Sequence, residues 1–331
     1  MGARHSLTRH CEEWRPAPRR SNLKLLLLLA ILLFGCAPAT PPLPVADQTQ
    51  TEPAPVIEPT QAPGTPTAVP ESVIQIRNAQ YQLGIPDSLQ VVQLTDGKFE
   101  QGTPGGADFI SVFVTDFAAL GDLDADGSDE IAALISENYG GTGVFVFLVV
   151  YAEVNGTLTF HTSTMVDDRP QLNALSIENG EIYLDATIHG FEDPGCCPML
   201  STTRHYRLAE GSQLDMTDYT TFTPDGRPRT ITIVSPLNGA EVFSSAQFKG
   251  KVAIAPFENT LAYRIYDVGG VELSAGAIPV TASDLGAPGT FDKMIPFGSI
   301  LSGAVIRVEV QDISAADGSL FAMDSVELVV K

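Results

Sequence analysis

Residues 304–311 read Ala-Val-Ile-Arg-Val-Glu-Val-Gln, a stretch that decides the fold expected for the C-terminal part of the chain. Apolar and polar side chains alternate in it: Ile306, Val308 and Val310 against Arg307, Glu309 and Gln311. Successive side chains of a strand point to opposite faces. The period of two therefore predicts a strand with one buried face and one face in water.

Six further runs of this kind lie between residues 228 and 331, separated by short loops. They are residues 230–234, 247–254, 261–266, 271–274, 289–294 and 325–330. About seven strands in roughly 100 residues predict an immunoglobulin-like β-sandwich. The segment contains no cysteine and no tryptophan, so it lacks the features of the disulfide-bonded antibody type.

Several pieces of this segment resemble a known family. Residues 233–239 (Ile-Val-Ser-Pro-Leu-Asn-Gly), 248–250, 257–264 and 289–291 are similar to the immunoglobulin-like domain of bacterial spore germination proteins. The resemblance implies extracytoplasmic adhesion or assembly, and not catalysis. It does not imply that the source organism forms spores, because such modules are grafted onto many proteins.

The part of the chain before this segment is also expected to be rich in strands. Residues 143–151 are apolar on both faces, which is typical of a central strand covered on each side. Asn155-Gly156 and Asn179-Gly180 are two-residue hairpin signals. Residues 73–81 fit a short helix or a strand, so an α+β domain is the alternative, and residues 203–208 are the last strand expected.

An acidic segment, Gly-Asp-Leu-Asp-Ala-Asp-Gly-Ser-Asp-Glu at 121–130, is the strongest candidate site. Carboxylates at loop positions 1, 3 and 5 converge into the hard oxygen shell that Ca²⁺ prefers, and Gly127 permits the sharp turn. Three carboxylates this close repel one another without a cation. The candidate ligands, at positions 1, 3, 5, 7 (through the backbone carbonyl) and 9, are Asp122, Asp124, Asp126, Ser128 and Glu130.

The acidic segment differs from an EF-hand, which needs a bidentate glutamate at position twelve, where this chain has Ala133. It resembles the calcium loops between strands of FG-GAP and related repeat proteins, which have an acidic residue at position nine. Only one copy is present, so a whole propeller is not expected. The resemblance and the absence of a neighbouring nucleophile or base favour a structural Ca²⁺, and a solvated acidic turn is the alternative.

Adjacent cysteines, Cys196 and Cys197, lie in Asp-Pro-Gly-Cys-Cys-Pro at 193–198. Outside the cytoplasm such a pair predicts a vicinal disulfide with a structural role. A soft-metal site with His189 and His205 is an alternative, although the spacing fits no standard zinc pattern. A redox-active pair is another. Phrases around both motifs resemble an uncharacterised family of bacterial envelope lipoproteins, which implies location and little chemistry.

The N-terminal segment predicts export and lipidation. Basic residues precede an apolar run of about ten residues at 25–34, which is a signal-peptide core and too short to span a bilayer, for which about 20 residues are needed. Leu33-Phe34-Gly35-Cys36 resembles the lipobox of bacterial lipoproteins, in which the cysteine is diacylated through sulfur; Phe34 is bulkier than usual. The alternatives are an ordinary signal peptide with a chance cysteine and, from Arg19-Arg20, a twin-arginine signal.

Residues 37–71 contain ten prolines and no aromatic or basic residue, which predicts a spacer, with a proline-rich ligand as the lesser alternative. The expected organisation has four parts: a lipoprotein signal peptide at 1–35, the lipidated cysteine and linker at 36–71, a β-rich envelope domain at 72–222, and the immunoglobulin-like domain at 228–331. The fold class is therefore mainly β.

The formal charge of −21 excludes a general nucleic-acid binder, because neutralising phosphates needs clustered Lys and Arg. No G-x-S-x-G, P-loop or H-E-x-x-H motif occurs. The sequence therefore predicts a non-catalytic binding or scaffold protein, lipid-anchored on the extracytoplasmic face of a bacterial cell membrane. Its expected partners are that membrane and an unknown envelope protein or polysaccharide. The alternatives are an envelope redox protein and a carboxylate-dependent hydrolase.

Overall fold

The computed structural model describes residues 71–331, except 86–89, 210–212 and 299. The expected signal peptide, Cys36 and the linker up to residue 70 lie outside the described residues. The described part begins with helix α1 (Glu71–Ile76), at the last residue of the expected linker. No helix within this described part has the length and apolar character needed to cross a membrane.

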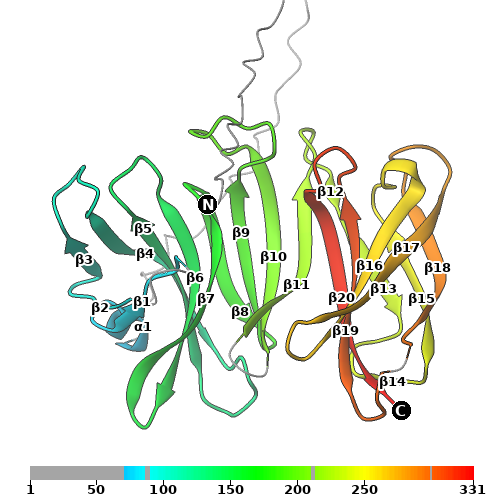
Figure 1. Cartoon of the computed structure of the whole chain (residues 1–331), viewed down its shortest axis with the longest axis horizontal. Coiled ribbons are helices and arrows are strands. Elements are labelled where there is room, and N and C mark those ends of the chain that lie inside the picture. The colour runs from blue at the N-terminus through cyan, green and yellow to red at the C-terminus, as the bar shows by residue number, and fades with distance from the viewer. Residues whose placement is uncertain (1–70, 86–89, 210–212, 299) are drawn as a thin grey trace, which may run out of the picture. The chain divides into compact units, whose positions relative to one another are not determined.

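The N-terminal half is built around an antiparallel five-stranded sheet in the order β3-β4-β5-β6-β7 (Figure 1). A short ribbon of β1 (Gln80–Gln82) and β2 (Val91–Gln93) follows α1, so residues 73–81 form both a helix and a strand. The sheet strands are β3 (Lys98–Gln101), β4 (Ile110–Gly121), β5 (Glu130–Asn138), β6 (Phe145–Val154) and β7 (Thr157–Asp168).

Both faces of β6 are buried, as its sequence predicts. Phe147, Val149 and Tyr151 pack in a core with α1 and the β1–β2 ribbon. Val146, Leu148 and Val150 pack in a second core against the strands that follow. The all-apolar run is therefore needed, because a polar side chain on either face of β6 would be taken out of water.

Four more strands cover the second core: β8 (Gln171–Glu178), β9 (Glu181–Ile188), β10 (Leu200–Ala209) and β11 (Gln213–Phe222). The hairpins at 155–156 and 179–180 are confirmed, with all four residues at positive φ. The prediction that the strand at 203–208 is the last one is wrong, because β11 follows it. The sequence pattern does not indicate β11, because its buried residues include polar ones such as Thr220 and Thr221.

The C-terminal half forms an immunoglobulin-like sandwich, as expected. Its long strand β17 pairs with β16 along its first part and with β18 along its last part, so that it joins the two sheets around one apolar core. The elements are β12 (Pro228–Arg229), β13 (Ile231–Ser235), β14 (Ala240–Val242), β15 (Ser245–Val252), the 3₁₀ turn η1 (Phe257–Asn259), β16 (Thr260–Asp267), β17 (Glu272–Ala282), β18 (Gly289–Pro296), β19 (Val305–Ile313) and β20 (Leu320–Val330).

The prediction that the strand at 304–311 has one solvent-exposed face is wrong. Glu309 and Gln311 are buried, and only about a tenth of the Arg307 side chain is exposed. Strand β11 pairs with β20, which brings Asp215 within 3.4 Å of the Arg307 guanidinium and places the Met216 carbonyl as a second acceptor for it. The alternation correctly predicted a strand, but a neighbouring segment covers the polar face.

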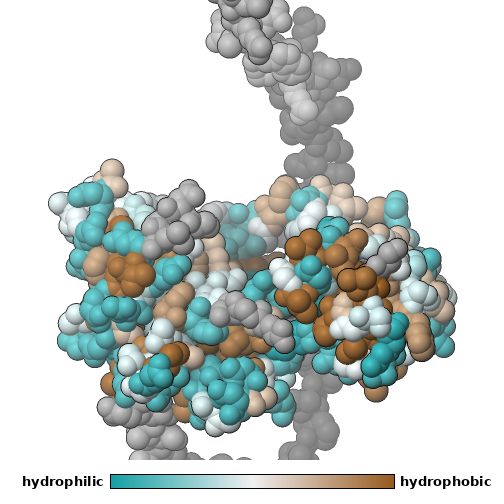
Figure 2. All heavy atoms as spheres, turned by 60° about the horizontal axis from the view of Figure 1, so that its bottom comes forward, coloured by the Kyte–Doolittle hydropathy of each residue, from teal (hydrophilic) through white to brown (hydrophobic). Residues whose placement is uncertain are grey.

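Exposed hydrophobic residues and net charge are unevenly distributed over the described part of the chain. Figure 2, in which the bottom of Figure 1 comes forward, shows hydrophobic residues gathered on the immunoglobulin-like part of this view. Among the exposed hydrophobic residues of that part are Phe243, which follows β14, and Leu301, which precedes β19. The net negative charge lies mainly in the part before it, since residues 72–222 contain 22 acidic and only five basic side chains.

Candidate functional site

The acidic segment is the loop of the β4–β5 hairpin. Gly121 and Glu130 are the last paired residues of the two strands, so the loop spans residues 122–129. Ala125 and Gly127 have positive φ angles of 62° and 89°, and the turn therefore needs residues that tolerate the left-handed region. The flanking strands are those of a β-hairpin, which agrees with the expectation that the loop is not an EF-hand.

Backbone hydrogen bonds to its own carboxylates hold the loop in shape. Asp122 accepts from the N–H groups of Ala125 at 2.7 Å and of Gly127 at 3.1 Å. Asp124 accepts from the N–H of Asp126 at 3.1 Å. These Asx-type turns fold the chain around the first carboxylate.

Three of the predicted ligands lie together. One carboxylate oxygen from each of Asp122, Asp124 and Glu130 lies within 4.8 Å of the others. Asp126 is not in this group, and its Oδ1 accepts from the N–H of Ser128 at 2.7 Å. The arrangement therefore brings together loop positions 1, 3 and 9, which suits a hard cation with oxygen ligands.

Burial makes this group sensitive to charge. Glu130 is buried, and its Oε2 accepts from the N–H of Leu123 at 2.8 Å. Burial raises the pKa of Glu130, the hydrogen bond from Leu123 opposes that shift, and the nearby charges of Asp124, Asp126 and Asp122 add to it. A bound divalent cation would favour the ionised form of Glu130, because it places a positive charge beside the carboxylates.

The loop is anchored to the second core. Leu123 is buried there with Leu134 and Ile182, so its side chain fixes the loop to this core. Gly121 is closely packed, because a Cβ at that position would lie 2.5 Å from Ile177. The EF-hand position twelve, Ala133, is fully buried in β5 and offers no ligand.

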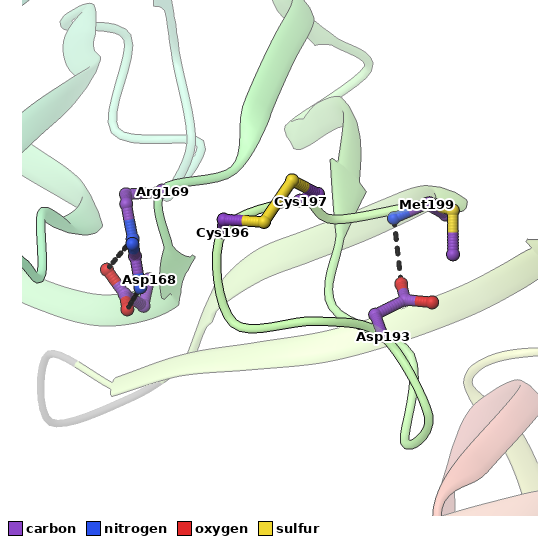
Figure 3. Close-up of a disulfide and its surroundings, with 6 residues drawn as sticks. All are labelled: Asp168, Arg169, Asp193, Cys196, Cys197 and Met199. Atoms are coloured by element: carbon purple, nitrogen blue, oxygen red, sulfur yellow. Dashed lines mark hydrogen bonds and ion pairs between the residues drawn. A yellow bond between two sulfur atoms is a disulfide. The ribbon is translucent and has the colours of Figure 1, made fainter.

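The second predicted site is the loop between β9 and β10. Cys196 and Cys197 form a disulfide there, and both residues are exposed (Figure 3). Asp193 organises the loop, since its Oδ2 accepts from the N–H groups of Gly190 and Met199, each at 2.8 Å. These hydrogen bonds lower the pKa of Asp193, so this carboxylate stays charged well below neutral pH.

The two histidines considered for a soft-metal site contact an aspartate and a tyrosine. Nδ1 of His189 lies 2.9 Å from Oδ2 of Asp167, which also accepts from the His189 N–H at 2.7 Å. The His205 ring contacts Tyr183 at an interplanar angle of 51°, with ring centroids 4.2 Å apart. Within the described ranges, the group of three side chains close enough to share an ion is the acidic one, and it includes neither the cysteines nor the histidines.

Sequence reasoning missed a buried carboxylate at the end of β5. Glu137 is almost fully buried and accepts from Tyr81 Oη at 2.5 Å, the Gly84 N–H at 2.8 Å and Tyr139 Oη at 2.6 Å. Burial and the Glu137 carboxylate raise the pKa of both tyrosines. The only sequence signal is a glutamate two residues after the apolar run at 131–135. Three donors bind its carboxylate, which makes it a structural acceptor.

The immunoglobulin-like fold of the C-terminal part agrees with a match to a known family. Residues 230–319 match the model of the immunoglobulin-like domain of bacterial spore germination. That family is not a known class of enzyme, and it suggests a non-catalytic binding or scaffold role for this segment. The match does not extend over residues 71–229. No curated protein matches the chain.

Proposed function

We propose that this chain is a lipid-anchored binding or scaffold protein of the bacterial cell envelope. The observation that carries the proposal is the immunoglobulin-like sandwich at 230–319, a module with no known enzymatic class. The Cys36 motif supports attachment through lipid, and the proline-rich segment that follows supports a spacer role. Removal of residues 1–35 leaves 296 residues with a side-chain charge of −25, which an anionic membrane surface repels. Acyl chains are therefore needed to hold the chain at the membrane.

The acidic hairpin loop serves this proposal as a structural Ca²⁺ site. Asp122, Asp124 and Glu130 supply the side-chain oxygens, and the Ser128 carbonyl is a further ligand in the loop pattern. Leu123 and Glu130 connect the loop to the buried core, so a bound ion would stabilise the β4–β5 hairpin. The ion has no catalytic part in this proposal.

A fractionation experiment tests the lipid anchor. Bacterial cells producing the full chain are separated into soluble and membrane fractions, with Cys36→Ser as the variant and Cys11→Ser as the matched control. We expect the wild type and C11S in the membrane fraction, released by detergent and not by salt. Cys36→Ser is expected to lose this detergent-dependent association. Equal membrane association of C36S and wild type would contradict the anchor.

A further inference from the structure

A groove of about 480 Å³ runs between the β1–β2 ribbon and the beginning of β7. It lies at one edge of the five-stranded sheet, where β7 pairs only with β6 among the described strands. Its lining is Asn78, Ala79, Gln80, Gln82, Val91, Gln93, Thr157, Leu158, Thr159 and Phe160. The groove is distinct from the acidic loop and from the disulfide loop, none of whose residues line it.

None of the ten lining residues is charged. This is unusual for its surroundings, because residues 72–222 carry 22 acidic and five basic side chains. Anionic ligands are repelled by such a domain, and a cationic ligand finds no ion pair among the groove residues. The groove therefore disfavours an anionic ligand, and its uncharged lining suits a neutral one.

The polar side chains of the groove carry amide and hydroxyl groups. Gln80 and Gln82 are two residues apart on β1, so they share one face of the ribbon, while Tyr81 between them is buried on the other. Gln93 is the strand partner of Gln80. The side-chain amides of Gln80 and Gln82 make no hydrogen bond within the described part of the chain, and each offers donors and an acceptor.

The opposite wall adds two hydroxyls, of which that of Thr159 already donates to the Thr157 carbonyl at 3.1 Å. Thr157 and Thr159 are exposed and two residues apart on β7, so their hydroxyls lie on the same face. Phe160 lines the groove and is held edge-on against Tyr81 and Tyr151, with ring centroids 5.9 and 6.0 Å apart. By the same period of two, the Phe160 ring faces the core on the other side of β7 from these hydroxyls, so the polar contacts that the groove offers come from amides and hydroxyls.

We propose that this groove binds a neutral, hydroxyl-rich glycan. Sugar hydroxyls both donate and accept hydrogen bonds, which matches the amide and hydroxyl side chains of the groove. The proposal names a ligand class for the binding role proposed above, but it depends neither on the lipid nor on calcium. An extended peptide that adds a strand to the open edge of β7 is the competing occupant.

The test uses the purified full chain and neutral hexasaccharides of β-1,4-linked N-acetylglucosamine, β-1,4-linked glucose and α-1,4-linked glucose. Binding is measured by isothermal titration calorimetry, with polygalacturonate as the anionic sugar and a Gly-Ser peptide as the extended peptide. The variant is Gln80→Ala with Gln82→Ala, and Gln171→Ala, an exposed glutamine on β8, is the matched control. Melting temperatures of all variants show whether the fold is kept.

We expect at least one neutral hexasaccharide to bind, and the double variant to weaken it about tenfold, because two hydrogen bonds are lost. Q171A should bind like the wild type. The absence of binding by all three sugars, equal binding by the double variant, or binding only by the peptide or by polygalacturonate overturns the proposal. These results leave the fractionation experiment unaffected, so the two proposals fail separately.

Discussion

Asp218 on β11 and Asp324 on β20 lie directly opposite each other in the ladder that joins the N-terminal strands to the sandwich. The charged groups nearby do not neutralise the pair. Glu181 on β9 adds a third negative charge, and burial lowers the pKa of His205, the partner of Asp218 on β10. Asp218 Oδ1 has Thr220 Oγ1 at 3.5 Å, and Asp324 accepts from the N–H groups of Ile233 and Ser325.

This pair predicts that the chain is more stable at mildly acidic pH than at pH 8. Burial, together with the facing Asp324 charge, raises the pKa of Asp218 to about 7, and burial raises that of Asp324 to about 6. Groups with raised folded-state pKa values stabilise the fold fully below the unfolded value of about 3.9, and that stability is lost as pH rises through 6 and 7. Urea unfolding from pH 5 to pH 8 measures this loss.

Asp218→Asn is the matching variant. We expect it to raise the free energy of unfolding at pH 8 by about 1–3 kcal/mol and to flatten the dependence between pH 5 and 8. Asp116→Asn, which changes an exposed residue of β4, is the control and should keep the wild-type slope. A D218N slope equal to that of the wild type would show that the facing carboxylates do not set the pH response.

Calcium is expected to stabilise the β4–β5 hairpin. A ligand present at about 100 times its Kd stabilises a fold by about 2.7 kcal/mol, so a chelator should lower the melting temperature by several degrees. Asp124→Asn is expected to remove this response, and Asp129→Asn, in the same loop but outside the ligand set, should keep it. An unchanged melting temperature of the wild type in chelator and in excess Ca²⁺ would contradict the site.

Removal of the hydroxyl group from each of two buried tyrosines should have opposite effects on the free energy of unfolding. Tyr81→Phe removes a donor from the buried Glu137 carboxylate and should cost about 1–3 kcal/mol. Tyr151→Phe removes a buried hydroxyl that has no hydrogen-bond partner among the described residues, so it should be neutral or stabilising. Chemical denaturation measures both, and an equal loss in the two variants would argue against the role given to Glu137.

The vicinal disulfide is expected to add little stability. Its cysteines are adjacent, so it closes almost no chain, and the entropy it removes from the unfolded state corresponds to about 1 kcal/mol. The double variant Cys196→Ser, Cys197→Ser should therefore melt close to the wild type. A loss several times larger would mean that the loop held by Asp193 depends on the covalent bond.

Local patterns in the sequence predicted most of the fold. The apolar run at 143–151 and the Asn-Gly pairs act through neighbouring residues only, and they predicted β6 and two hairpins correctly. Strand β11 and the burial of Glu309 depend on a pairing between residues about 100 positions apart. No local period reports such a pairing, because the polar groups concerned are satisfied by partners that only the fold supplies.

The candidate sites divide in the same way. The Asp122 loop is a local motif, and three of its five predicted ligand residues lie together in the structure. The groove beside Gln80 joins two segments about 80 residues apart, and the Glu137 cluster joins segments more than 50 apart. Their residues are ordinary strand residues in the sequence and become candidate features only through tertiary placement.

The central claim is that Cys36 carries the membrane anchor. Mass spectrometry of the N-terminal peptide of the chain isolated from bacterial membranes tests it most directly. We predict a peptide that begins at Cys36 and carries a diacylglyceryl group on its sulfur. An unmodified Cys36 thiol, or a chain that still retains residues 1–35, would contradict the account.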